Sequence, residues 1–331
     1  MFAATTADLA AARQQMALSL GWHIVLACLG VGFPVLLLVA ERRWLRTGEE
    51  RYRQVAKRWS KAFAVLFAVG AVSGTILSLE LGVLWPELMS RYGDVIGLPF
   101  AMEGIAFFLE AIFVGIYLYG WERLPPRLHW WSGVPIAVSG VLSAVFVVSA
   151  NAWMNQPRGF DVAADGSITN VDPVAAMLNP AFAPEAIHLV LAAFMVTGFL
   201  VAAIHGWRVL RSRAVEFDHL AFRIAFAVGA IAAPVQIVAG DDAARFIADR
   251  QPLKLAAIEG LEETRANAPL SIAGLVEIPS GLSLLAQHDP DAVVIGLDSA
   301  AAEDRPPFVP MLRACFQLMV AIGTGLTVLS A

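Results

Sequence analysis

The chain has 331 residues and a formal net charge of −5, and 58% of its residues are hydrophobic while 15% are charged. Its mean hydropathy of +0.67 excludes an ordinary soluble domain, in which about 25% of the residues carry a charge. The two cysteines, Cys28 and Cys315, lie in apolar stretches and give no disulfide framework or CxxC metal site. We interpret them as small core residues, and we expect no nucleic-acid partner.

Seven apolar runs predict membrane-spanning helices, because about 20 apolar residues cross a bilayer. The runs cover residues 16–40, 62–86, 99–120, 131–154, 184–206, 221–240 and 309–331. We do not expect the first run to be a cleaved signal peptide, since its leader holds one basic residue, Arg13, and the run is too long for an h-region. The predicted fold is therefore all-α, a polytopic membrane helix bundle.

Basic residues between the first two predicted helices indicate which side of the membrane they face. That connection holds Arg42, Arg43, Arg46, Arg51, Arg53, Lys57, Arg58 and Lys61. The connections expected on the opposite side hold one each, Arg91 and Arg158. Because basic residues gather in cytoplasmic loops, we expect the N-terminus outside. The chain then divides into six bundle helices over residues 1–240, an outer loop over 241–308 and the seventh helix over 309–331.

Three candidate haem-iron ligands, His23, His188 and Met319, lie in three of these apolar runs. A helix rises about 1.5 Å per residue, and counting from the outer ends places all three in the outer half of the bilayer. A lone membrane histidine is more often a hydrogen-bonded core residue. A second histidine and a methionine at similar depth favour haem, since His and Met are a common axial pair.

Two carboxylates, Glu103 and Glu110, lie seven residues apart on the third predicted helix, on one face and about 10 Å apart. Ionisable groups in a membrane are costly and usually mark proton or ion routes. Ser143 and Asn151 on the next helix would continue a hydrated path, and Glu80 is a third candidate acid. The alternative is that hydrogen-bond donors nearby neutralise the acids, and that Ser143 and Asn151 only form hydrogen bonds between helices.

Six fragments in order along the chain carry a family resemblance. They are Gly21-Trp22-His23, Met102-Glu103-Gly104 with Phe107-Phe108-Leu109-Glu110, Gly120-Trp121-Glu122-Arg123, Ala150-Asn151-Ala152-Trp153-Met154, Lys254-Leu255-Ala256-Ala257-Ile258-Glu259 and Met319-Val320. With them the chain resembles subunit I of the cytochrome bd-type quinol oxidases, the bacterial respiratory terminal oxidases. Ser78-Leu79-Glu80-Leu81-Gly82 is more similar to the cyanide-insensitive branch.

The resemblance implies a role for each matching residue. His188 and Met319 would ligate a low-spin haem b, and His23 would ligate one of two high-spin haems, a haem b and either haem d or a second haem b. Glu103 would lie at the high-spin pair, and Glu110 on a proton route from the cytoplasm. We leave open which high-spin haem His23 binds.

The outer loop would bind quinol through Lys254 and Glu259, with Glu259 accepting a quinol proton. Without the resemblance, a Lys–Glu pair five residues apart is more often a solvated surface feature. The implied enzyme is a multi-pass quinol:oxygen oxidoreductase of the bacterial plasma membrane. It would contact membrane lipid and a second oxidase subunit. Quinol protons would leave outside while oxygen is reduced to water with cytoplasmic protons, which generates a proton motive force without a pump.

Two departures from the family pattern leave alternatives open. Members usually have nine membrane helices, whereas seven are predicted here. In the family, the part after the seventh helix carries a Gly-Arg-Gln-Pro-Trp stretch and a glutamate that ligates a high-spin haem. Gln317 stands where some members have an arginine, and it brings no charge. The alternatives are a membrane electron-relay protein with only the low-spin haem b, an inactive truncated subunit that packs against a partner, and a proton-coupled transporter built around Glu103 and Glu110.

Overall fold

A computed structural model of the chain describes residues 6–211, 215–272 and 274–331. Its helices are α1 (Thr6–Thr47), α2 (Glu50–Leu84), α3 (Pro86–Gly120), α4 (Pro126–Asn155), α5 (Pro173–Met177), α6 (Phe182–Leu210), α7 (Glu216–Arg250), α8 (Pro252–Glu259), α9 (Gly281–Gln287) and α10 (Val309–Ser330), with the 3-10 turns η1 (Leu297–Ser299) and η2 (Ala302–Asp304). Its strands are β1 (Asp161–Val162), β2 (Ile168–Thr169), β3 (Arg265–Ala266), β4 (Leu270–Ile272), β5 (Val276–Ile278) and β6 (Val293–Val294).

Seven of the helices in the described ranges are long and apolar enough to cross a membrane, which confirms the predicted number. The observed helices run beyond the apolar segments at most ends. Helix α3 begins at Pro86, with proline at a first-turn position, and contains Pro99 in its interior. Proline suits the first turn because no amide is needed there. Helix α7 continues to Arg250, past the predicted end at residue 240.

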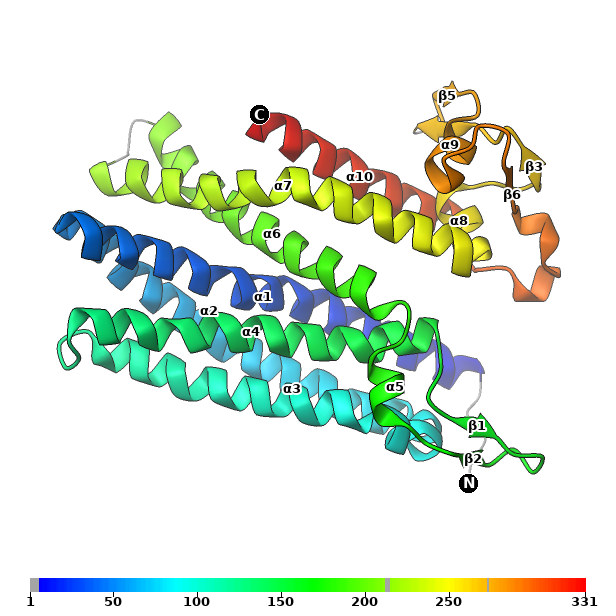
Figure 1. The fold of residues 1–331 in the computed structure, drawn as a ribbon, viewed down its shortest axis with the longest axis horizontal. Coiled ribbons are helices and arrows are strands. Elements are labelled where there is room, and N and C mark those ends of the chain that lie inside the picture. Colours follow the sequence, from blue (N-terminus) through cyan, green and yellow to red (C-terminus); the bar gives the residue numbers. More distant parts are fainter. Residues whose placement is uncertain (1–5, 212–214, 273) are drawn as a thin grey trace. The chain divides into compact units, whose positions relative to one another are not determined.

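The chain divides into two compact units, residues 1–232 and 233–331, and each is described by itself. In the first unit, α1, α2, α3 and α4 lie side by side, and α6 packs against α1 and α4 (Figure 1). Large side chains such as Leu36, Phe63 and Tyr117 are fully buried between them. Helices α6 and α7 approach closely, since a Cβ on Gly198 would lie 2.5 Å from the Gly229 nitrogen.

In the second unit, α8 and α10 pack together beside a small loop domain. The second unit has two antiparallel two-stranded sheets, β3–β6 and β4–β5, and the first unit has one, β1–β2. The loop domain has its own small core, which includes Leu255, Ala268, Leu282 and Val294. Leu255 belongs to α8, so this core holds α8 against the loop domain.

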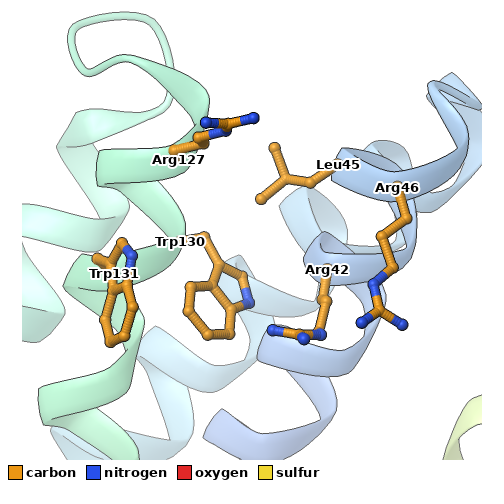
Figure 2. Close-up of a pocket in the computed structure, with 6 residues that line it drawn as sticks. All are labelled: Arg42, Leu45, Arg46, Arg127, Trp130 and Trp131. Carbon is orange, nitrogen blue, oxygen red and sulfur yellow. The ribbon is translucent and has the colours of Figure 1, made fainter.

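A surface pocket of about 300 Å³ lies between the end of α1 and the start of α4 (Figure 2). It belongs to the arginine-rich end of the first unit. We call it the arginine–tryptophan pocket. Its lining residues are Arg42, Leu45, Arg46, Arg127, Trp130 and Trp131.

Candidate functional site

His23 is held on α1 by a hydroxyl of α2. Its Nδ1 lies 2.9 Å from the Ser73 hydroxyl oxygen, and that hydroxyl donates its proton to the Gly70 carbonyl at 3.0 Å. A hydroxyl has one proton to give, so Ser73 accepts from Nδ1–H of His23. The Nε2 atom then carries a lone pair, which is the form of imidazole that binds a metal, oriented by its second hydrogen bond.

The ring of His23 lies against a glycine of α2. A Cβ on Gly74 would lie 2.9 Å from Cε1 of His23 and 3.4 Å from Nε2. One turn earlier, a Cβ on Gly70 would meet only the Leu26 Cβ, at 3.8 Å. The ring therefore needs a glycine at position 74 and not at position 70.

Glu80 lies two turns from Ser73 along α2 and is 9% exposed. Its Oε1 accepts hydrogen bonds from Gln15 Nε2 at 2.7 Å and from the Ser19 hydroxyl at 2.8 Å. Its Oε2 is buried without a hydrogen-bond partner in the described part of the chain. The third candidate acid is thus a buried group on the same pair of helices as His23.

Glu103 and Glu110 both face α4 from α3. The Ser143 hydroxyl donates to Glu103 Oε1 at 3.2 Å. Glu110 is 5% exposed and lies against Gly140, whose Cβ would be 3.2 Å from Oε1. The structure therefore brings three of the predicted proton-path residues to one helix interface. Asn151, two turns beyond Ser143, is exposed, and its role stays a prediction.

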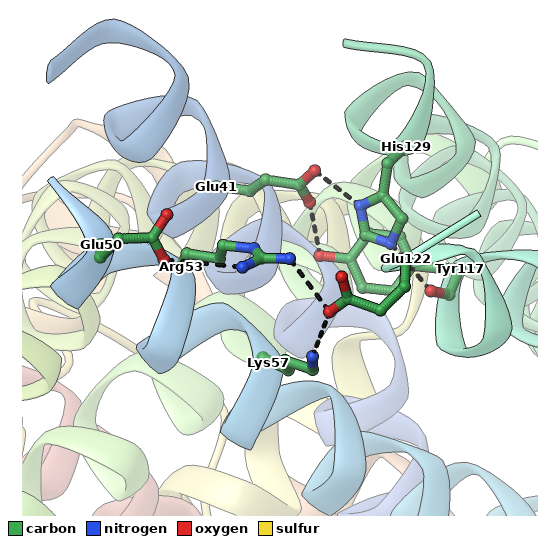
Figure 3. Close-up of polar contacts among 7 residues, drawn as sticks. All are labelled: Glu41, Glu50, Arg53, Lys57, Tyr117, Glu122 and His129. Carbon is green, nitrogen blue, oxygen red and sulfur yellow. Dashed lines mark hydrogen bonds and ion pairs between the residues drawn. The ribbon is translucent and has the colours of Figure 1, made fainter. Parts of the chain in front are cut away.

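Sequence reasoning missed a fully buried polar cluster at the arginine-rich end of the first unit (Figure 3). Glu41 of α1 is 0% exposed. It accepts a hydrogen bond from the Tyr117 hydroxyl at 2.7 Å and lies 2.7 Å from Nδ1 of His129. Nε2 of His129 lies 2.9 Å from the Tyr117 carbonyl oxygen. One signal was available, because Tyr117 is seven residues after Glu110 on the same face of α3.

An ion-pair group lies near that cluster on the surface (Figure 3). Glu122, in the turn after α3, lies 2.6 Å from the Lys57 ammonium and 3.1 Å from the Arg53 guanidinium. The hydrogen bond and charge of Lys57, followed by the charge of Arg53, lower the pKa of Glu122. Glu122 therefore ties the turn after α3 to α2.

A second missed cluster joins α2, α6 and α7. His205 Nδ1 lies 2.9 Å from Asp218 Oδ1, and the Trp59 indole donates to His205 Nε2 at 3.3 Å. Arg208 also pairs with Asp218, at 2.9 Å. Because Trp59 gives its only proton to Nε2, His205 carries its own proton on Nδ1. Both ring nitrogens are occupied, so His205 is a structural residue and not a ligand.

In the second unit, Glu259 ends α8 and is half-buried. Burial raises the pKa of Glu259 to about 7, although the charge of Arg313 partly lowers it. Arg313 lies over the left-handed Gly260 (φ 70°), where a Cβ would be 2.7 Å from Cδ of Arg313. Lys254, also half-buried, lies five residues before Glu259 on the same short helix.

Gln317 and Met319 lie on α10. Gln317 Nε2 donates to the Ser271 carbonyl at 2.7 Å, while the Met319 side chain is 49% exposed. His188 is half-buried on α6. Since His188 and Met319 belong to different units, their pairing stays a prediction.

These residues fit haem better than a free metal ion. Among the described residues there is no group of three His, Cys, Asp or Glu side chains that would hold a metal ion. Haem iron needs only one or two axial protein ligands. His23 meets that need, because a hydroxyl fixes its Nδ1 proton and a glycine leaves room for its ring.

Comparisons with known proteins identify the family. The family model of cytochrome bd terminal oxidase subunit I matches residues 11–331. The chain is 39% identical to the "Putative cytochrome bd menaquinol oxidase subunit I" of Bacillus subtilis (strain 168), over 96% of this chain and 74% of that protein. It is 32% identical to the cytochrome bd-II ubiquinol oxidase subunit 1 of Escherichia coli (strain K12), over 95% of this chain and 63% of that protein.

The structure agrees with the sequence match. The bd oxidase from Geobacillus thermodenitrificans superposes with a TM-score of 0.91 at 36% identity, covering 98% of this chain and 77% of that one. The chain thus spans about two thirds to three quarters of the length of these relatives. The resemblance found in the sequence is confirmed. The chain belongs to the cytochrome bd terminal oxidase subunit I family.

Proposed function

We propose that the chain is the haem-bearing subunit of a respiratory quinol oxidase in the bacterial plasma membrane. The observation that carries this proposal is the family match over residues 11–331, which includes six of the seven membrane helices in full. In the reaction, two quinols become two quinones and release four electrons and four protons. One oxygen molecule takes up four electrons and four other protons and becomes two waters.

The haems would supply the electron transfer and the oxygen chemistry. His23 would hold a high-spin haem, and His188 with Met319 would hold the low-spin haem b. The second high-spin haem is either haem d or haem b. The chain's own contribution is to bind these groups, to keep water out and to hold protons at defined carboxylates.

Glu259 would accept a proton from quinol, and Lys254 on the same helix would help to bind the quinol. Its pKa of about 7 suits a general base near neutral pH. One charged group approaches it from another element, Arg313 of α10. Arg313 would keep part of the Glu259 population ionised despite its burial.

We expect quinol oxidation to increase as the pH rises through about 7, because Glu259 must be ionised to accept a proton and its pKa is about 7. In Glu259→Gln this limb of the pH profile should disappear, with a loss of activity of roughly 100-fold at neutral pH. Steady-state quinol oxidation measured from pH 5.5 to about 8.5 checks this. Glu263→Gln, an exposed position on the same segment, is the control. A wild-type limb retained in Glu259→Gln would contradict the role.

Protons for oxygen reduction would reach Glu103 through Glu110 along the α3–α4 interface. The spacing of seven residues repeats in Glu103, Glu110 and Tyr117, which places them on one face of α3. The gaps between them, about 10 Å each, need bridging groups or water. Ser143 supplies one such group, at Glu103.

Gly74→Ala provides a test of His23 that does not remove the imidazole. The new methyl group would lie 2.9 Å from Cε1, so the ring must move. We expect the high-spin haem bands in the reduced-minus-oxidised spectrum to shift or weaken, while the low-spin b band stays. Gly70→Ala, where the nearest atom would be 3.8 Å away, should match the wild type. Equal spectra for both variants would argue against His23 as a ligand.

The function is tested with the oxidase purified together with its natural partner chains. We expect quinol-dependent oxygen consumption and a difference spectrum with both low-spin and high-spin haem bands. A far-red band would identify haem d, and its absence beside high-spin b bands would identify a second haem b. A lone low-spin b spectrum without oxygen consumption would favour the electron-relay alternative, and a spectrum without haem would overturn the proposal.

A further inference from the structure

The arginine–tryptophan pocket combines three cations with two indole rings in a cavity of about 300 Å³ (Figure 2). Arg42 and Arg46 come from the last turns of α1, and Arg127 comes from the first turn of α4. The Arg42 guanidinium lies 5.5 Å from the centre of the Trp130 ring. The Trp130 indole donates to the Leu38 carbonyl at 3.0 Å, which fixes that ring as one wall of the pocket.

The arginines of this pocket differ from four other cations at the same end of the unit, which have carboxylate partners. Arg51, Arg53, Lys57 and Arg208 each pair with a carboxylate. Within the ranges that the structure describes, no carboxylate pairs with Arg42, Arg46 or Arg127. Three guanidinium groups without a counter-charge around one cavity favour an anion there. Guanidinium binds phosphate with paired hydrogen bonds.

The position of the pocket along the helices indicates what kind of anion it takes. The first apolar run ends at residue 40 and the fourth begins at residue 131. The arginines therefore lie just outside the apolar core, and the tryptophans lie at its edge, where Trp side chains concentrate in membrane proteins. Trp131 is 60% exposed, so it would lie beside lipid. The basic-residue distribution assigns this end to the cytoplasmic leaflet, which carries anionic lipids.

We propose that the arginine–tryptophan pocket binds the phosphodiester headgroup of an anionic phospholipid of the cytoplasmic leaflet. The arginines would contact the phosphate oxygens, while Leu45 and Trp131 would contact the glycerol and the upper acyl chain. A free phosphate ion offers the same oxygens, but it has no apolar part that would contact Leu45 and Trp131. The site is independent of the haem and quinol assignments.

Native mass spectrometry of the delipidated oxidase complex, titrated with phosphatidylglycerol, tests the proposal. We expect one saturable high-affinity lipid, and about fivefold weaker binding for each arginine removed, so roughly 25-fold for the double variant Arg42→Gln/Arg127→Gln. Arg43→Gln, an exposed neighbour outside the pocket, should bind as the wild type. Unchanged haem spectra would show that the variants are folded. Trp131→Ala provides a second variant that keeps all the charges and should also weaken binding.

Three outcomes would overturn the proposal. Phosphatidylcholine binding as tightly as phosphatidylglycerol would mean that the arginines do not select an anionic headgroup. Displacement of the lipid by millimolar inorganic phosphate would identify a site for a small anion. Equal lipid affinity in the double variant, in Trp131→Ala and in Arg43→Gln would mean that the lipid binds elsewhere on the complex.

Discussion

His188→Ala is expected to remove the whole low-spin b band from the reduced-minus-oxidised spectrum. In the proposed assignment the iron would keep at most the thioether of Met319 once the imidazole is gone, and a haem with one weak axial ligand would not stay low-spin. The high-spin bands should remain, since His23 is held by Ser73 on a different pair of helices. Optical spectra of purified complexes check both expectations.

Met319→Leu makes this test more specific. The change keeps the volume and apolar character of the side chain but removes the thioether. His188 and Met319 belong to different units of the chain, so loss of the same band in both variants would place them at one haem. His219→Ala, at an exposed histidine of α7, is the control. A low-spin band that survives in either ligand variant would refute the assignment.

Glu110→Gln is expected to slow oxygen consumption by about 100-fold or more, the usual scale for loss of a proton-transfer group. Glutamine has nearly the same shape, so it should preserve the packing against Gly140 and the haem content. Because the variant cannot release a proton, the block should be the same at low and high quinol concentration. Oxygen-electrode measurements at several quinol concentrations, with haem quantified in the same samples, check this.

Glu87→Gln on the same helix is the matched control. Glu87 is exposed in the first turn of α3, away from the interface with α4, and its replacement should leave turnover unchanged. If Glu110→Gln turned over at the wild-type rate with intact haems, protons would have to enter by another route. Glu103, Glu110 and Ser143 at the α3–α4 interface would then have a structural role only.

The number of membrane helices and their approximate centres could be predicted from the sequence, because apolar length alone decides what spans a bilayer. The helix ends could not. Helix α3 starts thirteen residues before the predicted start, since the polar segment from Pro86 continues as helix where water and headgroups accept polar side chains. The short strands could not be predicted either, because two or three residues are too few to show an alternation of polar and apolar side chains.

The candidate site was predicted where several polar groups share one helix face. The spacing of Glu103 and Glu110 identified them as candidates, and the structure shows that Ser143 donates a hydrogen bond to Glu103. Glu41 and His129 were missed because each stands alone at the edge of an apolar run, where a single polar residue looks like an interface residue. Only the fold brings them within 2.7 Å of each other.

The buried cluster around Glu41 also bears on how the bundle is assembled in the membrane. Among the described residues, the side-chain partners of this carboxylate come from α3 and α4, and not from α2, which follows α1 directly in the chain. During synthesis, the Glu41 carboxylate therefore lacks its tyrosine partner until α3 has been inserted and its histidine partner until α4 has been inserted. The hydrogen bonds of this carboxylate are complete only when α1, α3 and α4 are all present, so this cluster cannot form before the fourth helix has entered the membrane.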